Sequence, residues 1–296
     1  MDNLITRLDL HQFLRNPVAR WVVFLVALGV LAAIDINAEL VMLDRSSIYP
    51  FLVLAVVPAS LSFKIRWRAI QIFRRCCIVI GISVCGLNVL SIVSNMDEVS
   101  QFLSAQRLVY APLALGLILS FLIKIIEPKK IEEYRTSILE VFLVALFIPL
   151  VTAASIHFVA EGLPLTNFIS PSAWGVCVLI SIVCLVHPDF SELRIVERAF
   201  NASLAMVVVF VVIGVSTWTF GISSGDIAAL GEIVAFATIG ILYGSLFGLF
   251  TICLGGQVDQ TNKIVKFFDW HMIEAYAFYA LIIMPPLSML ELFNAL

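Results

Sequence analysis

The positive charges of this 296-residue chain are segregated between alternate gaps in its apolar sequence. Of the 18 Lys and Arg residues, all but Arg45 and Arg107 fall in clusters that are separated by pairs of long apolar stretches. Positive charge beside a membrane span resists translocation, so the clustered gaps are predicted to face the cytoplasm. The clusters are Arg7, Arg15 and Arg20; Lys64, Arg66, Arg68, Arg74 and Arg75; Lys124, Lys129, Lys130 and Arg135; Arg194 and Arg198; and Lys263 and Lys266.

The composition is that of a protein built for lipid. Apolar residues make up 61% of the chain, charged residues 13%, and the mean hydropathy is +1.05. Soluble domains run at roughly 45–50% apolar and about 25% charged. No basic patch is interleaved with aromatic residues, so nucleic acid is not an expected partner. The six cysteines lie in or beside apolar stretches and are interpreted as small, buried apolar side chains.

The apolar stretches predict an all-α, polytopic integral membrane helix bundle of about nine transmembrane helices, with the N-terminus inside. Crossing a bilayer core of roughly 30 Å takes about 20 mostly apolar residues. No gap is long enough for a soluble domain, so residues 1–296 are expected to form a single transmembrane domain that starts with a short cytoplasmic segment, 1–17. The expected location is a bacterial inner (plasma) membrane. The predicted spans are Val18–Val41, Ile48–Phe63, Cys76–Ser94, Leu108–Ile126, Ile138–Ala160, Ser170–His187, Ala199–Phe220, Ile233–Leu254 and Met272–Phe293.

Prolines lie near the expected start of helices that run from the outer to the inner face. Pro50, Pro112 and Pro171 each occupy such a position. A proline in the first helical turn gives up an N–H that has no partner within the helix. We therefore expect helices to begin close to these residues.

The gap between the second and third predicted spans is the most basic part of the chain. Its cations are Lys64, Arg66, Arg68, Arg74 and Arg75, and helical spacing places Lys64, Arg68 and Arg75 on one face. A basic amphipathic segment on the cytoplasmic leaflet attracts anionic lipid at about 1 kcal/mol per nearby charge. The segment is therefore predicted to bind anionic lipid at the membrane surface. The alternative is that it only anchors the topology.

Three glycines repeat every fourth residue in the eighth predicted span. Gly240, Gly244 and Gly248 share one helix face, where a neighbouring helix can approach closely. The pattern predicts tight helix packing. It leaves open whether the neighbour belongs to the same chain or to a second copy in a homo-oligomer or a membrane-protein partner.

Ionisable side chains within or beside membrane spans are candidates for function, because placing a charge in the apolar part of the bilayer costs free energy. Asp269, His271 and Glu274 are predicted to converge at the cytoplasmic start of the last span, with Glu140 at similar depth in the fifth. A histidine beside carboxylates can titrate near neutral pH and serve in a proton relay. Ordinary capping of a helix end is the alternative. A secondary candidate is the pair Asp35 and Glu39, one helical turn apart near the outer face.

Three functional classes fit these observations. A transporter or permease for a small solute or ion fits the many spans, the short gaps and the helix breaks predicted at Pro149 and Pro285-Pro286, whose free carbonyls can line a cavity. A membrane-embedded enzyme on a lipid-linked substrate fits less well, because no acid, base and nucleophile converge on one side. A scaffold or accessory subunit of a larger complex is the third class. No cofactor is predicted by any motif.

Overall fold

The computed structural model describes residues 17–38, 45–61, 66–94, 99–126, 138–159, 165–186, 195–224 and 227–254. Within these residues every regular element is helical, which confirms the all-α class. Each of the first eight predicted spans corresponds to one α-helix, and the ninth lies outside the described residues. The helices are α2 (Pro17–Ala38), α3 (Arg45–Leu61), α4 (Arg66–Ser94), α5 (Val99–Ile126), α6 (Ile138–Val159), α7 (Pro171–Val186), α8 (Ile195–Ser224) and α9 (Ile227–Cys253), with a short 3-10 helix η2 (Leu165–Phe168) before α7.

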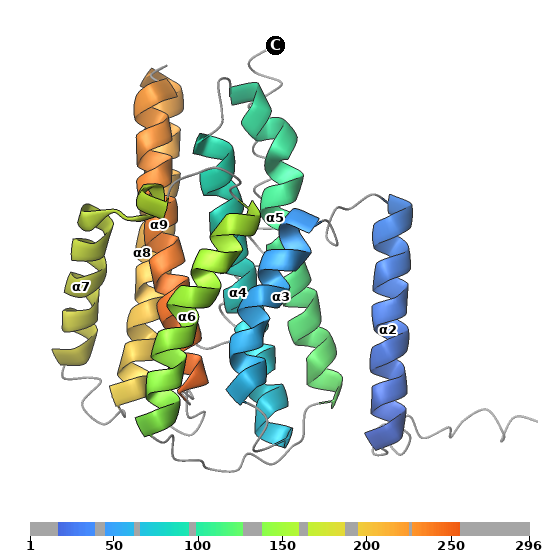
Figure 1. Cartoon of the computed structure of the whole chain (residues 1–296). Coiled ribbons are helices and arrows are strands. Elements are labelled where there is room, and N and C mark those ends of the chain that lie inside the picture. Colours follow the sequence, from blue (N-terminus) through green and yellow to red (C-terminus); the bar gives the residue numbers. More distant parts are fainter. Residues whose placement is uncertain are drawn as a thin grey trace, which may run out of the picture.

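Successive helices run in opposite directions, so the bundle has two distinct ends (Figure 1). One end holds the N-termini of α2, α4, α6 and α8 and the C-termini of α3, α5, α7 and α9. We call it the basic end, because the described cations gather on the helix segments there. Those cations are Arg20, Arg66, Arg68, Arg74, Arg75, Lys124 and Arg198, whereas Arg45 and Arg107 lie toward the opposite end.

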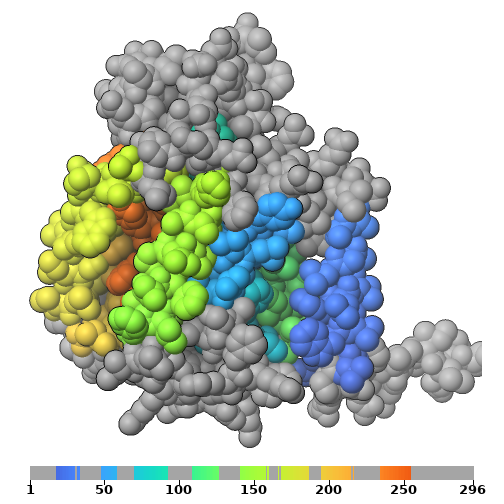
Figure 2. Space-filling view, viewed as in Figure 1, coloured from blue at the N-terminus to red at the C-terminus, as the bar shows by residue number. Residues whose placement is uncertain are grey.

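The centre of the bundle is formed by α4 and α9. Helix α4 packs against α3, α5, α6 and α9, and α9 packs in addition against α8 and α7. Helices α2 and α7 lie at opposite sides of the molecule, and α2 packs mainly against α5 (Figure 1). Large apolar side chains are exposed on the outer helices, among them Val22 and Leu25 of α2, Leu150 of α6 and Leu179 of α7. Figure 2 shows α2, α6 and α7 on the surface of the molecule.

Four of the described helices contain a stretch that is long and apolar enough to cross a membrane. These stretches are Ile70–Ile92, Val109–Ile126, Ile195–Gly214 and Val234–Cys253. The described apolar stretches of α2, α3, α6 and α7 are shorter, at 10–17 residues. The chain is therefore built as an integral membrane protein, and two of these four helices, α4 and α9, form the centre of the bundle.

The contact between α4 and α5 depends on two glycines. A Cβ atom on Gly81 of α4 would lie 2.7 Å from the carbonyl oxygen of Pro112, and one on Gly116 of α5 would collide with the carbonyl oxygen of Cys77. Both collisions are with backbone atoms, which cannot rotate away. The two helices can approach this closely because neither glycine carries a side chain.

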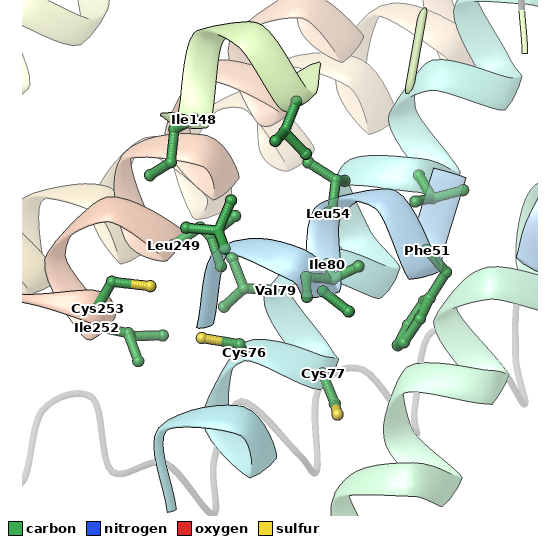
Figure 3. Close-up of a cluster of buried hydrophobic side chains, with 14 of the residues drawn as sticks. Phe51, Leu54, Cys76, Cys77, Val79, Ile80, Ile148, Leu249, Ile252 and Cys253 are labelled. Carbon is green, nitrogen blue, oxygen red and sulfur yellow. The ribbon is translucent and has the colours of Figure 1, made fainter. Parts of the chain in front are cut away.

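The largest apolar cluster lies where α3, α4, α5, α6, α8 and α9 meet (Figure 3). Phe51 and Leu54 of α3 reach it from one side and Leu249 and Ile252 of α9 from the other, with Ile80 of α4 between them. A second cluster joins α7, α8 and α9 with residues of α4 and α6. Packing of this kind holds the helices by close van der Waals contact, which is the main attraction available between apolar helices in lipid.

Helices extend beyond the apolar windows that predict them, and this changes the role of two prolines. Pro50 and Pro112 lie inside α3 and α5, because these helices begin at Arg45 and Val99. The prediction that they open helices is wrong for both. Polar residues at the ends of a span are compatible with helix, so the apolar window marks the lipid-embedded part and not the helix start. Pro171 does begin α7, as its sequence position predicts.

The start of α7 is built by a local cap and one distant tyrosine. Ser170 precedes Pro171, and its Oγ accepts a hydrogen bond from the N–H of Ala173 at 3.3 Å. The hydroxyl of Tyr243 in α9 accepts a bond from the N–H of Ser170 at 3.1 Å and donates one to the carbonyl oxygen of Phe168 at 3.0 Å. Tyr243 thereby ties the connection between η2 and α7 to the central helix.

The basic segment is continuous with a central helix. Helix α4 begins at Arg66, so Arg66, Arg68, Arg74 and Arg75 belong to the same 29-residue helix as the span that follows. Arg74 and Arg75 are half-buried, and Gln71 between these pairs is buried. The segment is thus not a separate surface helix, because its later turns are packed into the bundle.

Candidate functional site: the buried polar residues of α4, α8 and α9

Polar side chains are buried along three central helices that are otherwise apolar. Helix α9 packs against both α4 and α8, and all three meet at Gly248. A Cβ atom on Gly248 would lie 3.1 Å from the Oγ of Ser203 in α8 and 3.6 Å from the Cγ1 of Val79 in α4. The buried polar residues are Gln71, Ser83 and Asn88 of α4; Glu197, Asn201 and Ser203 of α8; and Thr238, Ser245 and Thr251 of α9.

A direct hydrogen bond between side chains joins α4 to α9. The Oγ atoms of Ser83 and Ser245 are 2.8 Å apart, and Ser245 also donates to the carbonyl oxygen of Leu242 at 3.0 Å. Ser83 lies 2.9 Å from the carbonyl oxygen of Val79, so its single proton serves either Val79 or Ser245. This pair fixes the register of the two helices, because a shift of one residue would separate the hydroxyls.

Other hydroxyls in this region bond to their own helix. Thr238 donates to the carbonyl oxygen of Val234 at 2.7 Å, and Thr251 donates to that of Gly248 at 2.9 Å. Ser203 donates to the carbonyl oxygen of Phe200 at 2.6 Å. Such bonds remove most of the cost of placing a hydroxyl in an apolar medium. They leave the oxygen lone pairs as acceptors that a solute or a moving helix can use.

The three glycines of α9 lie against α8. A Cβ atom on Gly240 would collide with the ring of Phe210, and one on Gly244 would lie 2.9 Å from the Cβ of Met206. Gly248 of α9 faces Ser203, which also belongs to α8. In the structure the neighbour at this face is therefore a helix of the same chain, and α8 and α9 approach one another along three successive turns.

Glu197 is the ionisable residue of this buried set, and the amide side chain of Asn201 lies near it in the same helix. They are one turn apart in α8 at the basic end, and only 6% and 4% of their surfaces are exposed. Between them, Arg198 donates from Nη1 to the carbonyl oxygen of Leu185 at 3.0 Å and so caps the C-terminal end of α7. A carboxylate enclosed by a helix bundle marks a candidate site for a solute, an ion or a proton.

The predicted relay residues are not brought together by the described part of the chain. Asp269, His271 and Glu274 lie outside the described residues, as do Glu39 and Lys64. Glu140 belongs to the first turn of α6, which begins at the basic end, and Asp35 belongs to the last turn of α2. The side chains of Glu140 and Asp35 are outside the described set, so the relay stays a prediction.

Sequence reasoning missed Glu197 and Asn201. Both fall in Ile195–Gly214, a stretch that is long and apolar enough to cross a membrane. The available signal is the i to i+4 spacing of a carboxylate and an amide at the start of this stretch. That signal is weak, because acidic residues in a first helical turn also complement the helix dipole without any further role. Burial distinguishes the two readings, and burial depends on how α8 packs against its neighbours.

Fold and site together define the class of the protein as an all-helical integral membrane protein with a buried polar centre. Comparison with known proteins adds no narrower class: no protein-family model, no curated protein and no solved structure matches the chain. Among the described residues, no group of three or more His, Cys, Asp or Glu side chains is placed to hold a metal ion.

Proposed function

We propose that the chain is a transporter- or permease-like protein that moves a small solute or ion across a bacterial inner membrane. The proposal includes nine spans, with the N-terminus and the basic end in the cytoplasm. It is supported by the gathering of described cations on one end of the bundle, because positive charge is retained on the cytoplasmic side. It also places the basic segment of α4 beside the anionic lipid of the inner leaflet.

The observation that carries the proposal is the burial of Glu197 beside Asn201 at the basic end of α8. Removing a carboxylate from water inside an apolar bundle is expensive, and ionisable groups in such positions line solute pathways or relay protons. Asn201 supplies an amide that can donate to and accept from a polar solute. A packing role alone would be served better by apolar side chains.

The predicted relay of the last span belongs to the same end of the molecule in this proposal. Asp269, His271 and Glu274 would stand at the cytoplasmic mouth with Glu140, and the histidine would provide a group that titrates near neutral pH. The break expected at Pro285-Pro286 would supply unpaired carbonyl oxygens further along the same helix. Glu197 then forms the part of this pathway that is buried in the described bundle.

The test is proton or solute flux through purified protein in liposomes. Vesicles hold a pH-sensitive dye, a potassium diffusion potential drives the current, and a panel of amino acids, sugars and inorganic ions is added outside. Glu274→Gln is expected to abolish flux, and Glu197→Gln is expected to reduce it by at least about tenfold, the effect of roughly 1.4 kcal/mol on the rate-limiting step. Glu39→Gln is the matched control, because it removes one carboxylate near the opposite face, and it should matter less.

The outcomes separate the candidate functions. A larger loss from Glu39→Gln than from Glu274→Gln would move the site to the outer face. Unchanged flux in all three variants, with expression and dispersity equal to the parent, would contradict the transport proposal and favour the scaffold.

A scaffold or accessory subunit is the second candidate, and one observation favours it. Several buried hydroxyls, such as those of Thr238 and Thr251, bond within their own helix, and Ser83 bonds to Ser245. The glycine contacts hold α4 close to α5 and α9 close to α8. Such an interior suits a rigid support whose outward apolar helices meet partner helices. A membrane-embedded enzyme remains the third class, and it would require a convergent acid, base and nucleophile on one face.

A further inference from the structure

Two thiols meet between α4 and α9 in a place that the proposed function does not use. Cys76 lies in α4 and Cys253 is the last residue of α9, and their side chains are directed toward one another between the two helices (Figure 3). Both belong to the same apolar cluster, with exposed fractions of 0% and 4% (Figure 3). Each cysteine is free, so the pair stands in the reduced form.

We infer that Cys76 and Cys253 form an oxidisable pair whose disulfide locks the basic end of α9 to α4. The oxidant is a small, uncharged two-electron oxidant of the peroxide or diazene class. With a peroxide, each thiol gives up its hydrogen and the two sulfurs join in one S–S bond, while the O–O bond breaks and the oxygens leave as two water molecules.

The geometry selects this pair over the cysteine next to it in sequence. Figure 3 shows the sulfur of Cys76 directed toward Cys253, whereas the sulfur of Cys77 points away from both. Consecutive helical residues are rotated by about 100° around the axis, so the side chains of Cys76 and Cys77 leave α4 in different directions. Cys177 and Cys184 belong to α7 and to the second apolar cluster.

The position of Cys253 gives the link a structural consequence. Helix α9 ends at this residue, and the chain continues from there toward its last predicted span. In the reduced protein the described bond between α4 and α9 is the Ser83–Ser245 pair, two to three turns further into the bundle. A disulfide at the end of α9 would add a covalent tie where the helix is otherwise held by apolar contact. In the proposed topology this end faces the cytoplasm, which keeps thiols reduced until an oxidant appears.

The experiment uses the full chain in lipid nanodiscs treated with diamide or hydrogen peroxide, followed by peptide mapping without reductant. The expected product is one linked peptide that contains Cys76 and Cys253, lighter than the two free peptides by about 2 Da and separated again by dithiothreitol. Cys253→Ser should abolish this product. Cys77→Ser is the matched control and should leave it unchanged.

A reference pair sets the oxidation conditions. Ser83 and Ser245 join the same two helices with their Oγ atoms 2.8 Å apart, so Ser83→Cys with Ser245→Cys should link when Cys76 and Cys253 are both replaced by Ser. The concentration and time that link this reference are then applied to the natural chain. Formation of the Cys76–Cys253 peptide with a higher melting temperature than the reduced protein supports the inference. A missing link under these conditions, or one through Cys77, overturns it.

Discussion

Replacing Gly244 by leucine tests whether the contact between α8 and α9 holds the bundle together. A Cβ atom at this position would lie 2.9 Å from the Cβ of Met206, 3.0 Å from the Cγ2 of Val207 and 3.1 Å from the backbone nitrogen of Val207. The position of a Cβ atom is set by its backbone, so rotation of Met206 cannot relieve the first contact. The two helices must therefore separate to admit any side chain at Gly244.

The expected magnitude follows from two opposing effects. Glycine in a helix interior is about 1 kcal/mol less favourable than alanine, and a leucine recovers most of that difference. Overpacking a close contact costs on the order of 1–3 kcal/mol, and forced separation of α8 from α9 places Gly244→Leu toward the upper part of that range. For a chain of this size, each kcal/mol corresponds to roughly 2 °C in melting temperature, so a fall of about 2–6 °C is expected.

Gly29→Leu in α2 is the matched control, because a Cβ atom there would have nothing within 4 Å. It carries the same change in helix propensity and the same added side chain, so the difference between the two variants isolates the contact with α8. Both are compared with the parent by thermal unfolding in detergent and by size-exclusion chromatography with light scattering. Equal melting temperatures and oligomeric states for the two variants would refute the packing argument and would indicate that the glycine face of α9 meets lipid.

Two further predictions concern the η2–α7 connection and the topology. Tyr243→Phe removes the hydroxyl that bonds to Ser170 and Phe168, so we expect the free energy of unfolding to fall by about 1–2 kcal/mol. Amide exchange around Ser170 should become faster, with exchange in α4 as the internal control. Unchanged exchange would show that the cap forms without the tyrosine. Reporter fusions after Lys130 should report the cytoplasm and a fusion after Leu296 the far side; a cytoplasmic C-terminus would remove one span from the nine.

The candidate site shows where sequence reasoning stops. The helical spacing of Gly240, Gly244 and Gly248 predicts a closely packed face on α9. The spacing does not identify α8 as the neighbouring helix. Glu197 gave no signal beyond an acidic residue near the start of a helix, and its burial arises from packing around α8. The predicted relay of Asp269, His271 and Glu274 lies outside the described residues and stays a prediction.

The sequence by itself determined the all-α class, the positions of the described helices and the separation of cations toward one end. These features follow from the hydropathy and charge of short stretches of the chain, because those properties decide which stretches enter a bilayer and which stay on its cytoplasmic side. Only the tertiary structure decided which helices form the centre, that Ser83 meets Ser245, and that Cys76 lies beside Cys253. These contacts join residues that are far apart in the chain, and they form because the helices pack closely. The chemical character of one residue does not determine which distant residue it will contact.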